Sequence, residues 1–193
     1  MWLREAAVNF EAIVNFLGSL TFSQATWLFP LVFALHVLEE APQFRAWAQR
    51  YTSSKFTQGD FVRNNAMGMV IGIVFCLAVW FFPNRITVFL FFSLGINQSF
   101  LNTLFHVGTT AAYGVYSPGL ITSLTLYPPL FYYLSRLAYK QNLISTRGGI
   151  GALVVAAVIH AVVVAQQVYF VKFSFGRRSV ARRQALNNQS EWR

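Results

Sequence analysis

The feature that most constrains this sequence is a series of apolar stretches, several of them near 20 residues long. An α-helix needs about 20 apolar residues to cross the hydrocarbon core of a bilayer. Composition agrees, since 55% of the 193 residues are hydrophobic and only 11% are charged, against about 25% charged in soluble domains. The sequence therefore predicts an all-α fold, a polytopic helical bundle of an integral membrane protein.

Five stretches define the expected topology. We expect transmembrane helices over about residues 24–40, 61–82, 86–113, 119–139 and 150–173, all within one domain that covers residues 1–173. Residues 1–18 place apolar side chains at helical spacing between charged ones, which predicts a helix lying in the membrane interface. Pro128 and Pro129 should kink the fourth helix. Residues 174–193 form a polar, basic C-terminal tail.

Basic residues favour one orientation of these helices. Fifteen Lys and Arg outnumber six Asp and Glu, and five spans place ten of the basic residues on the side of the tail and five on the other. The positive-inside rule then predicts a cytoplasmic tail, and we expect the protein in a bacterial inner membrane. Because the charges flank apolar stretches, we expect them to contact anionic membrane lipids and not nucleic acid.

Three ionisable residues near the end of the first stretch indicate a functional site. His36, Glu39 and Glu40 are spaced i, i+3 and i+4, so they project from one face of a helix. Each charge near a bilayer centre costs about 2.5–3.5 kcal/mol on insertion scales, and such residues usually mark function. Imidazole and carboxylate ligands suit a divalent metal such as zinc, iron or manganese.

We therefore expect His36 and Glu40 as metal ligands and Glu39 as a general base, with the two carboxylates able to exchange roles. An alternative without a metal is a buried ion-pair network with Arg45 or Arg63 that orients the helices.

Polar residues of two later stretches fall near the same depth. Asn102 and His106 are one turn apart in the inner half of the third predicted span, and His160 lies near the middle of the fifth. All three histidines of the chain are thus expected inside the membrane. We expect His106 and His160 as further metal ligands, and Asn102 as a catalytic hydrogen-bond donor to an oxyanion.

The two motifs together carry a resemblance. His36-Val37-Leu38-Glu39-Glu40, followed by Asn102-Thr103-Leu104-Phe105-His106, resembles a family of membrane proteins named for its HXXEE motif. That family is also described by an NXXXH motif and an additional histidine. The resemblance covers roughly residues 25–170 and implies enzymatic activity without specifying a reaction.

These observations lead to a ranked set of functions. The leading hypothesis is an intramembrane enzyme dependent on zinc or iron, with hydrolysis as the first choice of reaction. A site at membrane depth implies a hydrophobic small-molecule substrate, either a lipid or an isoprenoid. Alternatives are a di-iron membrane oxygenase and a non-enzymatic accessory subunit of a larger membrane complex that binds a pigment, quinone or lipid. Ion translocation is less favoured because the sequence has no internal repeat.

Overall fold

The computed structural model describes residues 2–162 and residue 165, and this part of the chain contains helices and turns but no strand. The helices are α1 (Trp2–Ser19), α2 (Phe22–Ala25), α3 (Leu28–Glu40), α4 (Phe44–Tyr51), α5 (Gln58–Phe81), α6 (Arg85–Phe91), the π-helix η1 (Phe92–Ile96), α7 (Asn97–Tyr113), α8 (Leu120–Thr125), α9 (Tyr127–Lys140) and a last helix, Thr146–Val162. The predicted all-α fold is confirmed for the described residues.

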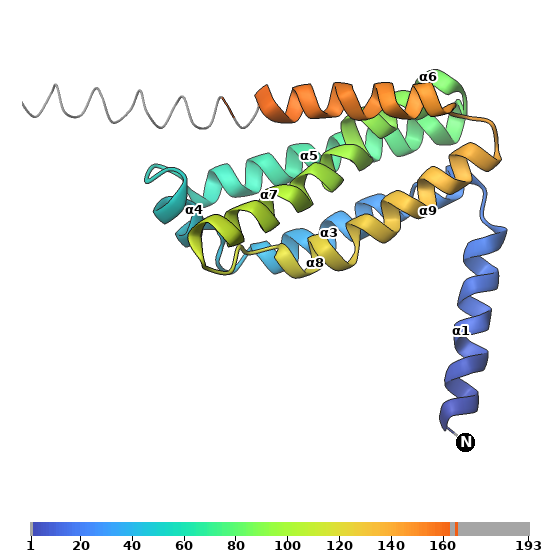
Figure 1. Ribbon diagram of the computed structural model, residues 1–193, viewed down its shortest axis with the longest axis horizontal. Coiled ribbons are helices and arrows are strands. Elements are labelled where there is room, and N and C mark those ends of the chain that lie inside the picture. Colours follow the sequence, from blue (N-terminus) through green and yellow to red (C-terminus); the bar gives the residue numbers. More distant parts are fainter. Residues whose placement is uncertain (1, 163–164, 166–193) are drawn as a thin grey trace, which may run out of the picture.

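The long helices form an elongated bundle. α3, α5, α7, α9 and the helix Thr146–Val162 run along its length, and successive ones point in opposite directions (Figure 1). α1 leaves the bundle at a steep angle, and the bend between Glu11–Ser19 and Phe22–Glu40 is 119°. One end of the bundle therefore holds α4 and the α7–α8 connection, and α1 departs from the opposite end (Figure 1).

Fewer than five helices are clear membrane spans. Two are long and apolar enough to cross a membrane, α5 and the continuous segment Arg85–Tyr113, which matches the second and third predicted spans. A third is added if the bent pair that ends at Glu40 counts as one span. The first and fourth predicted spans are each broken into two helices. Beyond Val162 only residue 165 is described, so most of residues 163–173 and the predicted basic tail lie outside the described residues.

Proline explains both breaks. Pro30 has no N–H to donate to the carbonyl of Thr26, four residues earlier, and α2 ends just before that residue. The Thr26 carbonyl instead accepts from the backbone N–H of Phe29 at 2.9 Å and from the Cys76 thiol at 3.3 Å. In the fourth predicted span, Leu126 separates α8 from α9, which has prolines in its first turn. The predicted kink is thus confirmed.

A π-helix interrupts the third long segment. η1 carries five residues between α6 and α7, and such insertions are most often single turns within α-helices. The side chain of Gln98 donates to the Ser93 carbonyl at 3.3 Å and to the Ala156 carbonyl at 3.1 Å. This amide therefore binds the irregular turn to the last described helix.

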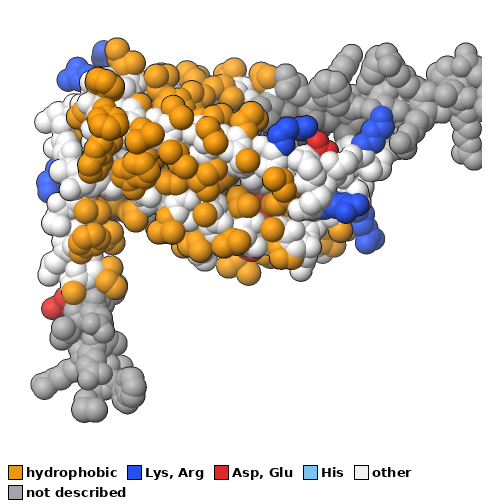
Figure 2. All heavy atoms as spheres, turned by 180° about the vertical axis from the view of Figure 1, so that it is seen from behind, with side chains coloured by type: hydrophobic (Ala, Val, Ile, Leu, Met, Phe, Trp, Pro, Cys, Tyr) orange, Lys and Arg blue, Asp and Glu red, His pale blue; other side chains and the backbone are white. Residues whose placement is uncertain are grey.

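The outside of the bundle is largely apolar. Large hydrophobic side chains are more than half exposed on several helices, among them Leu31, Leu38, Val70, Phe81, Ile121 and Val158. Figure 2 shows hydrophobic side chains over most of one face, with Lys and Arg near its two ends. Soluble monomers rarely expose apolar patches larger than a few hundred Å². This surface is consistent with a protein that sits in a membrane.

Candidate metal centre

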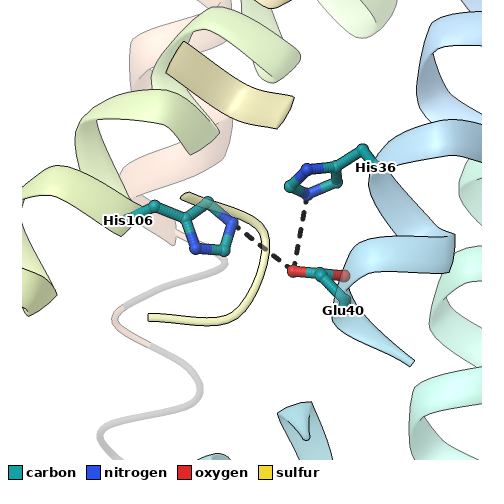
Figure 3. Close-up of side chains that lie close together, drawn as sticks. All are labelled: His36, Glu40 and His106. Atoms are coloured by element: carbon teal, nitrogen blue, oxygen red, sulfur yellow. Dashed lines mark ion pairs between the residues drawn. The ribbon is translucent and has the colours of Figure 1, made fainter. Parts of the chain in front are cut away.

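Three of the predicted site residues meet at the end of the bundle that holds α4. His36 and Glu40 lie one turn apart on α3, and His106 reaches them from α7 (Figure 3). Glu40 Oε1 is 3.4 Å from His36 Nε2 and 3.4 Å from His106 Nε2. All three side chains are buried, and their ligand atoms lie within 4.8 Å of one another. The described residues thus contain a compact His–Glu–His cluster.

The orientation of the His36 ring is set by Thr122 of α8. The Thr122 hydroxyl lies 2.9 Å from His36 Nδ1 and donates its own hydrogen to the Gly119 carbonyl at 3.3 Å. With that hydrogen on the Gly119 carbonyl, the hydroxyl oxygen is free to accept a hydrogen bond from His36 Nδ1–H. In this tautomer the lone pair of the neutral ring is on Nε2, the atom that faces Glu40.

His106 is held in the same way from the α7–α8 connection. Its Nδ1 lies 2.9 Å from the Ser117 hydroxyl. The Asn102 side-chain nitrogen lies 3.1 Å from His36 Nε2 and 3.1 Å from His106 Nε2. An amide NH₂ has two hydrogens, one for each of these acceptors. When each ring carries its proton on Nδ1, both Nε2 atoms present lone pairs next to the Glu40 carboxylate.

This donor set fits a divalent metal. In the tautomers with both protons on Nδ1, a divalent cation between the two Nε2 atoms and the Glu40 carboxylate would be attracted to all three. In tetrahedral zinc sites, metal–ligand distances of about 2.0–2.1 Å place ligand atoms about 3.3 Å apart. The two 3.4 Å distances from Glu40 Oε1 match that separation. Imidazole and carboxylate ligands also suit non-haem iron.

A glycine closes over the cluster. Gly119 has φ +96°, and a Cβ at this position would come within 2.6 Å of His36 Cε1, 2.9 Å of Glu40 Cγ and 3.0 Å of His106 Cε1. Any side chain here would displace these three residues. The backbone of the α7–α8 connection therefore packs directly on the three residues.

Sequence reasoning did not identify several residues around the cluster. Ser117, Gly119 and Thr122 line it from the α7–α8 region, and the buried ring of Tyr127 lies 5.0 Å from that of His36. In the sequence, Ser-Pro-Gly predicts only a turn. The one signal in the sequence was the position of this turn directly after the span that carries His106.

Glu39 is not part of the cluster. Its carboxylate accepts from the backbone N–H of Ile121 at 3.0 Å and of Thr122 at 2.7 Å, and from the Tyr116 hydroxyl. The side chain is partly exposed and faces the start of α8. The structure thus separates the two adjacent carboxylates that the sequence placed on one face. The role of Glu39 as a general base stays a prediction.

Two other expected contacts are not formed. His160 Nδ1 faces the Gln98 side-chain oxygen at 3.3 Å, and this histidine does not belong to the cluster. Arg63, one of the two cations expected in an ion-pair network, instead pairs with Asp60 at 2.8 Å in the first turns of α5. In the metal-free ion-pair network, Arg63 was a candidate partner of the buried carboxylates. Glu40 instead has two histidines as its neighbours.

Comparison with known proteins identifies the family. A sequence model described as a protein of unknown function with an HXXEE motif matches residues 27–134, more than half of the chain. The chain belongs to this family. No curated protein and no solved structure matches it.

The matched region of the HXXEE protein contains every residue of the cluster. It includes the motif His36–Glu40, as well as Asn102, His106 and the whole α7–α8 connection. It ends before the helix that carries His160. The motif after which the family is named thus supplies two of the three clustered side chains, His36 and Glu40.

Proposed function

We propose that this HXXEE protein is a metal-dependent intramembrane hydrolase that acts on a lipid or isoprenoid substrate. The observation that carries the proposal is the convergence of two histidine Nε2 atoms on Glu40 Oε1, with the Nδ1 atom of each ring next to a hydroxyl group. Three protein ligands with a free fourth position are typical of catalytic zinc sites, whereas structural sites have four.

The proposal places five segments across the membrane. These are α2–α3, α5, α6–α7, α8–α9 and the helix that begins at Thr146. Their alternating directions and apolar outer surface support this arrangement (Figure 1). The cluster would then lie near the cytoplasmic face, with the tail on the same side, and α1 would lie in the opposite interface. The protein would thus be an integral protein of a bacterial inner membrane.

Each residue of the centre has a proposed role. His36, Glu40 and His106 would hold zinc or iron. A metal here would supply Lewis acidity and lower the pKa of a coordinated water to about 7. Asn102 already directs its NH₂ group to the centre and would donate to an oxyanion that develops there. Glu40 would take the general-base role that the sequence allowed for either carboxylate, and its second oxygen would accept a proton.

The alternatives fit the contacts less well. A di-iron oxygenase would need further ligands such as Glu39 and His160, whose side chains bind other groups. An accessory subunit that binds a pigment through one histidine does not need a carboxylate between two histidines. Leu38 and Ile121, next to site residues in the sequence, are more than half exposed, and such apolar side chains favour a substrate that arrives through the lipid.

Isotope incorporation tests the proposed reaction even when the substrate has not been identified. Zinc-loaded protein would be reconstituted in vesicles of a total bacterial lipid extract and incubated in H₂¹⁸O, and products would be identified by mass spectrometry. We expect ¹⁸O in a newly formed acid or alcohol with wild-type protein, and at least a hundredfold less with Glu40→Gln. The variant Asp60→Asn, altered at the same end of the bundle, should match wild type.

Two outcomes would contradict a hydrolase. One is equal ¹⁸O incorporation with wild type and Glu40→Gln. The other is label that enters only from ¹⁸O₂ with iron-loaded protein, which would establish the oxygenase instead.

A further inference from the structure

The helix α8 begins without a capping side chain of its own. Its N-cap residue is Gly119, and helix N-caps normally use Ser, Thr, Asp or Asn to accept from the first backbone N–H groups. A side chain is excluded at this position because even a Cβ would come within 3.0 Å of each of the three clustered residues. The close packing over the cluster therefore leaves the first turn of α8 without a local acceptor.

Glu39 supplies the missing acceptor from another helix. Its Oε1 accepts from the N–H of Ile121 at 3.0 Å and its Oε2 from the N–H of Thr122 at 2.7 Å. These are two of the groups that an N-cap would satisfy. The two carboxylates of the motif thus have different positions: Glu40 lies in the cluster, and Glu39 joins α3 to α8.

Thr122 connects this cap to the metal centre. Its backbone N–H binds Glu39, and its hydroxyl lies 2.9 Å from His36 Nδ1. The same hydroxyl donates to the carbonyl of Gly119, the residue that covers all three ligands. A shift at the start of α8 would therefore move both the partner of the His36 ring and the backbone over the cluster.

Tyr116 completes the attachment from the α7–α8 connection. Its hydroxyl donates to Glu39 Oε1. Partial burial, and then the adjacent Glu39 carboxylate, raise the pKa of Tyr116 to about 12. The phenol therefore stays protonated at neutral pH and remains a donor.

We propose that Glu39 is a positioning residue, a helix cap supplied by α3 that holds Thr122 and Gly119 where they orient the His36 ring. This inference rests on the proposed metal site and assigns a different role from that of a general base. Metal-binding histidines donate their other ring N–H to a neighbouring acceptor, which fixes the ring tautomer, and losing such a partner typically lowers metal affinity 10–100-fold.

Cobalt binding measures the predicted effect. Co²⁺ would be titrated into detergent-purified full-length protein and followed by its visible absorption. Glu39→Gln keeps the shape of the side chain but cannot accept through both terminal atoms, so we expect at least tenfold weaker binding and an altered spectrum. Thr122→Val should have a similar effect. If both residues act through the His36 ring, their effects are not additive. The double variant should then lose much less Co²⁺ affinity than the product of the two single losses.

Asp60→Asn is the matched control. Asp60 caps α5 at the same end of the bundle by accepting from the Thr57 backbone N–H at 2.9 Å, and it has no link to His36. This variant should lower thermal stability and leave Co²⁺ affinity within twofold of wild type. Equal losses of affinity in Asp60→Asn and Glu39→Gln would overturn the proposal, as would normal Co²⁺ binding with abolished turnover in Glu39→Gln.

The histidine tautomer gives a second test that does not need a metal. In metal-free protein, ¹⁵N NMR of the His36 ring should show a proton on Nδ1 alone in wild type and in Asp60→Asn. Glu39→Gln should show a mixture of both tautomers. An unchanged ring in Glu39→Gln would overturn the positioning role. Failure of wild-type protein to bind Co²⁺ would instead overturn the metal centre, and the tautomer result would still decide the role of Glu39.

Discussion

At the scale of single residues, Gly119 should be the most sensitive position of the site outside the ligands. Gly119→Ala adds a methyl group against His36, Glu40 and His106, all within 3.0 Å of the new Cβ. Gly114→Ala is the control, because this glycine also has a positive φ, +64°, but has open space around its Cβ position. Both variants should lose about 1–2 kcal/mol of stability from the backbone conformation.

Only Gly119→Ala should also lose metal affinity, by at least tenfold, in a Co²⁺ titration. Its unfolding free energy should fall by a further 1–3 kcal/mol, roughly the cost of overpacking. Equal behaviour of the two alanine variants in both measurements would show that the backbone of Gly119 does not constrain the cluster.

Helical spacing predicted which side chains share a helix face, but neither the direction of Glu39 nor the place of His160 outside the cluster. His36 and Glu40 are four residues apart, as are Asn102 and His106, so each pair shares a face. Glu39 and Glu40 are adjacent, and adjacent residues are rotated by about 100° around a helix. That rotation directs only one of the two carboxylates to the histidines, and the start of α8 occupies the other direction.

At the scale of helices, Gln98 should matter for packing and not for the metal. Its side chain binds the Ser93 carbonyl, the Ala156 carbonyl and His160. Gln98→Leu leaves these partners without their hydrogen bonds and should lower the unfolding free energy by about 1–3 kcal/mol. Metal content, measured by elemental analysis of the purified variant, should equal that of wild type. A loss of metal in Gln98→Leu would indicate that His160, which Gln98 holds, contributes to metal binding after all.

Element boundaries were predictable where they depend on local chemistry. The apolar lengths located α5 and Arg85–Tyr113, and the prolines located the break before α9. The π-helix η1 was not predicted, because the Gln98 side chain that binds its Ser93 carbonyl also binds the Ala156 carbonyl of a helix distant in the sequence. The role of the α7–α8 connection was missed for the same reason, since its hydroxyl groups act only after the chain has folded over the histidines.

At the scale of the whole molecule, labelling can decide between five and three membrane spans. Ser54, between α4 and α5, and Thr146, the first residue of the last described helix, are exposed. The α4–α5 connection and the start of that helix lie at opposite ends of the bundle (Figure 1). Cysteine would be placed at one or the other, with the native Cys76 buried as a silent background. With five spans, an impermeant maleimide should label Ser54→Cys from the cytoplasmic side and Thr146→Cys from the other side. Labelling of both from one side would support three spans.

Metal stoichiometry tests whether His36, Glu40 and His106 hold a metal. Elemental analysis would compare detergent-purified wild-type protein with His36→Ala, Glu40→Gln and His106→Ala after the same exposure to zinc and iron(II), with His160→Ala as the matched histidine control. We predict close to one zinc or iron per chain in wild type and in His160→Ala, and its loss in the other three variants. Equal metal content in wild type and the three ligand variants, or none in any of them, would contradict the account.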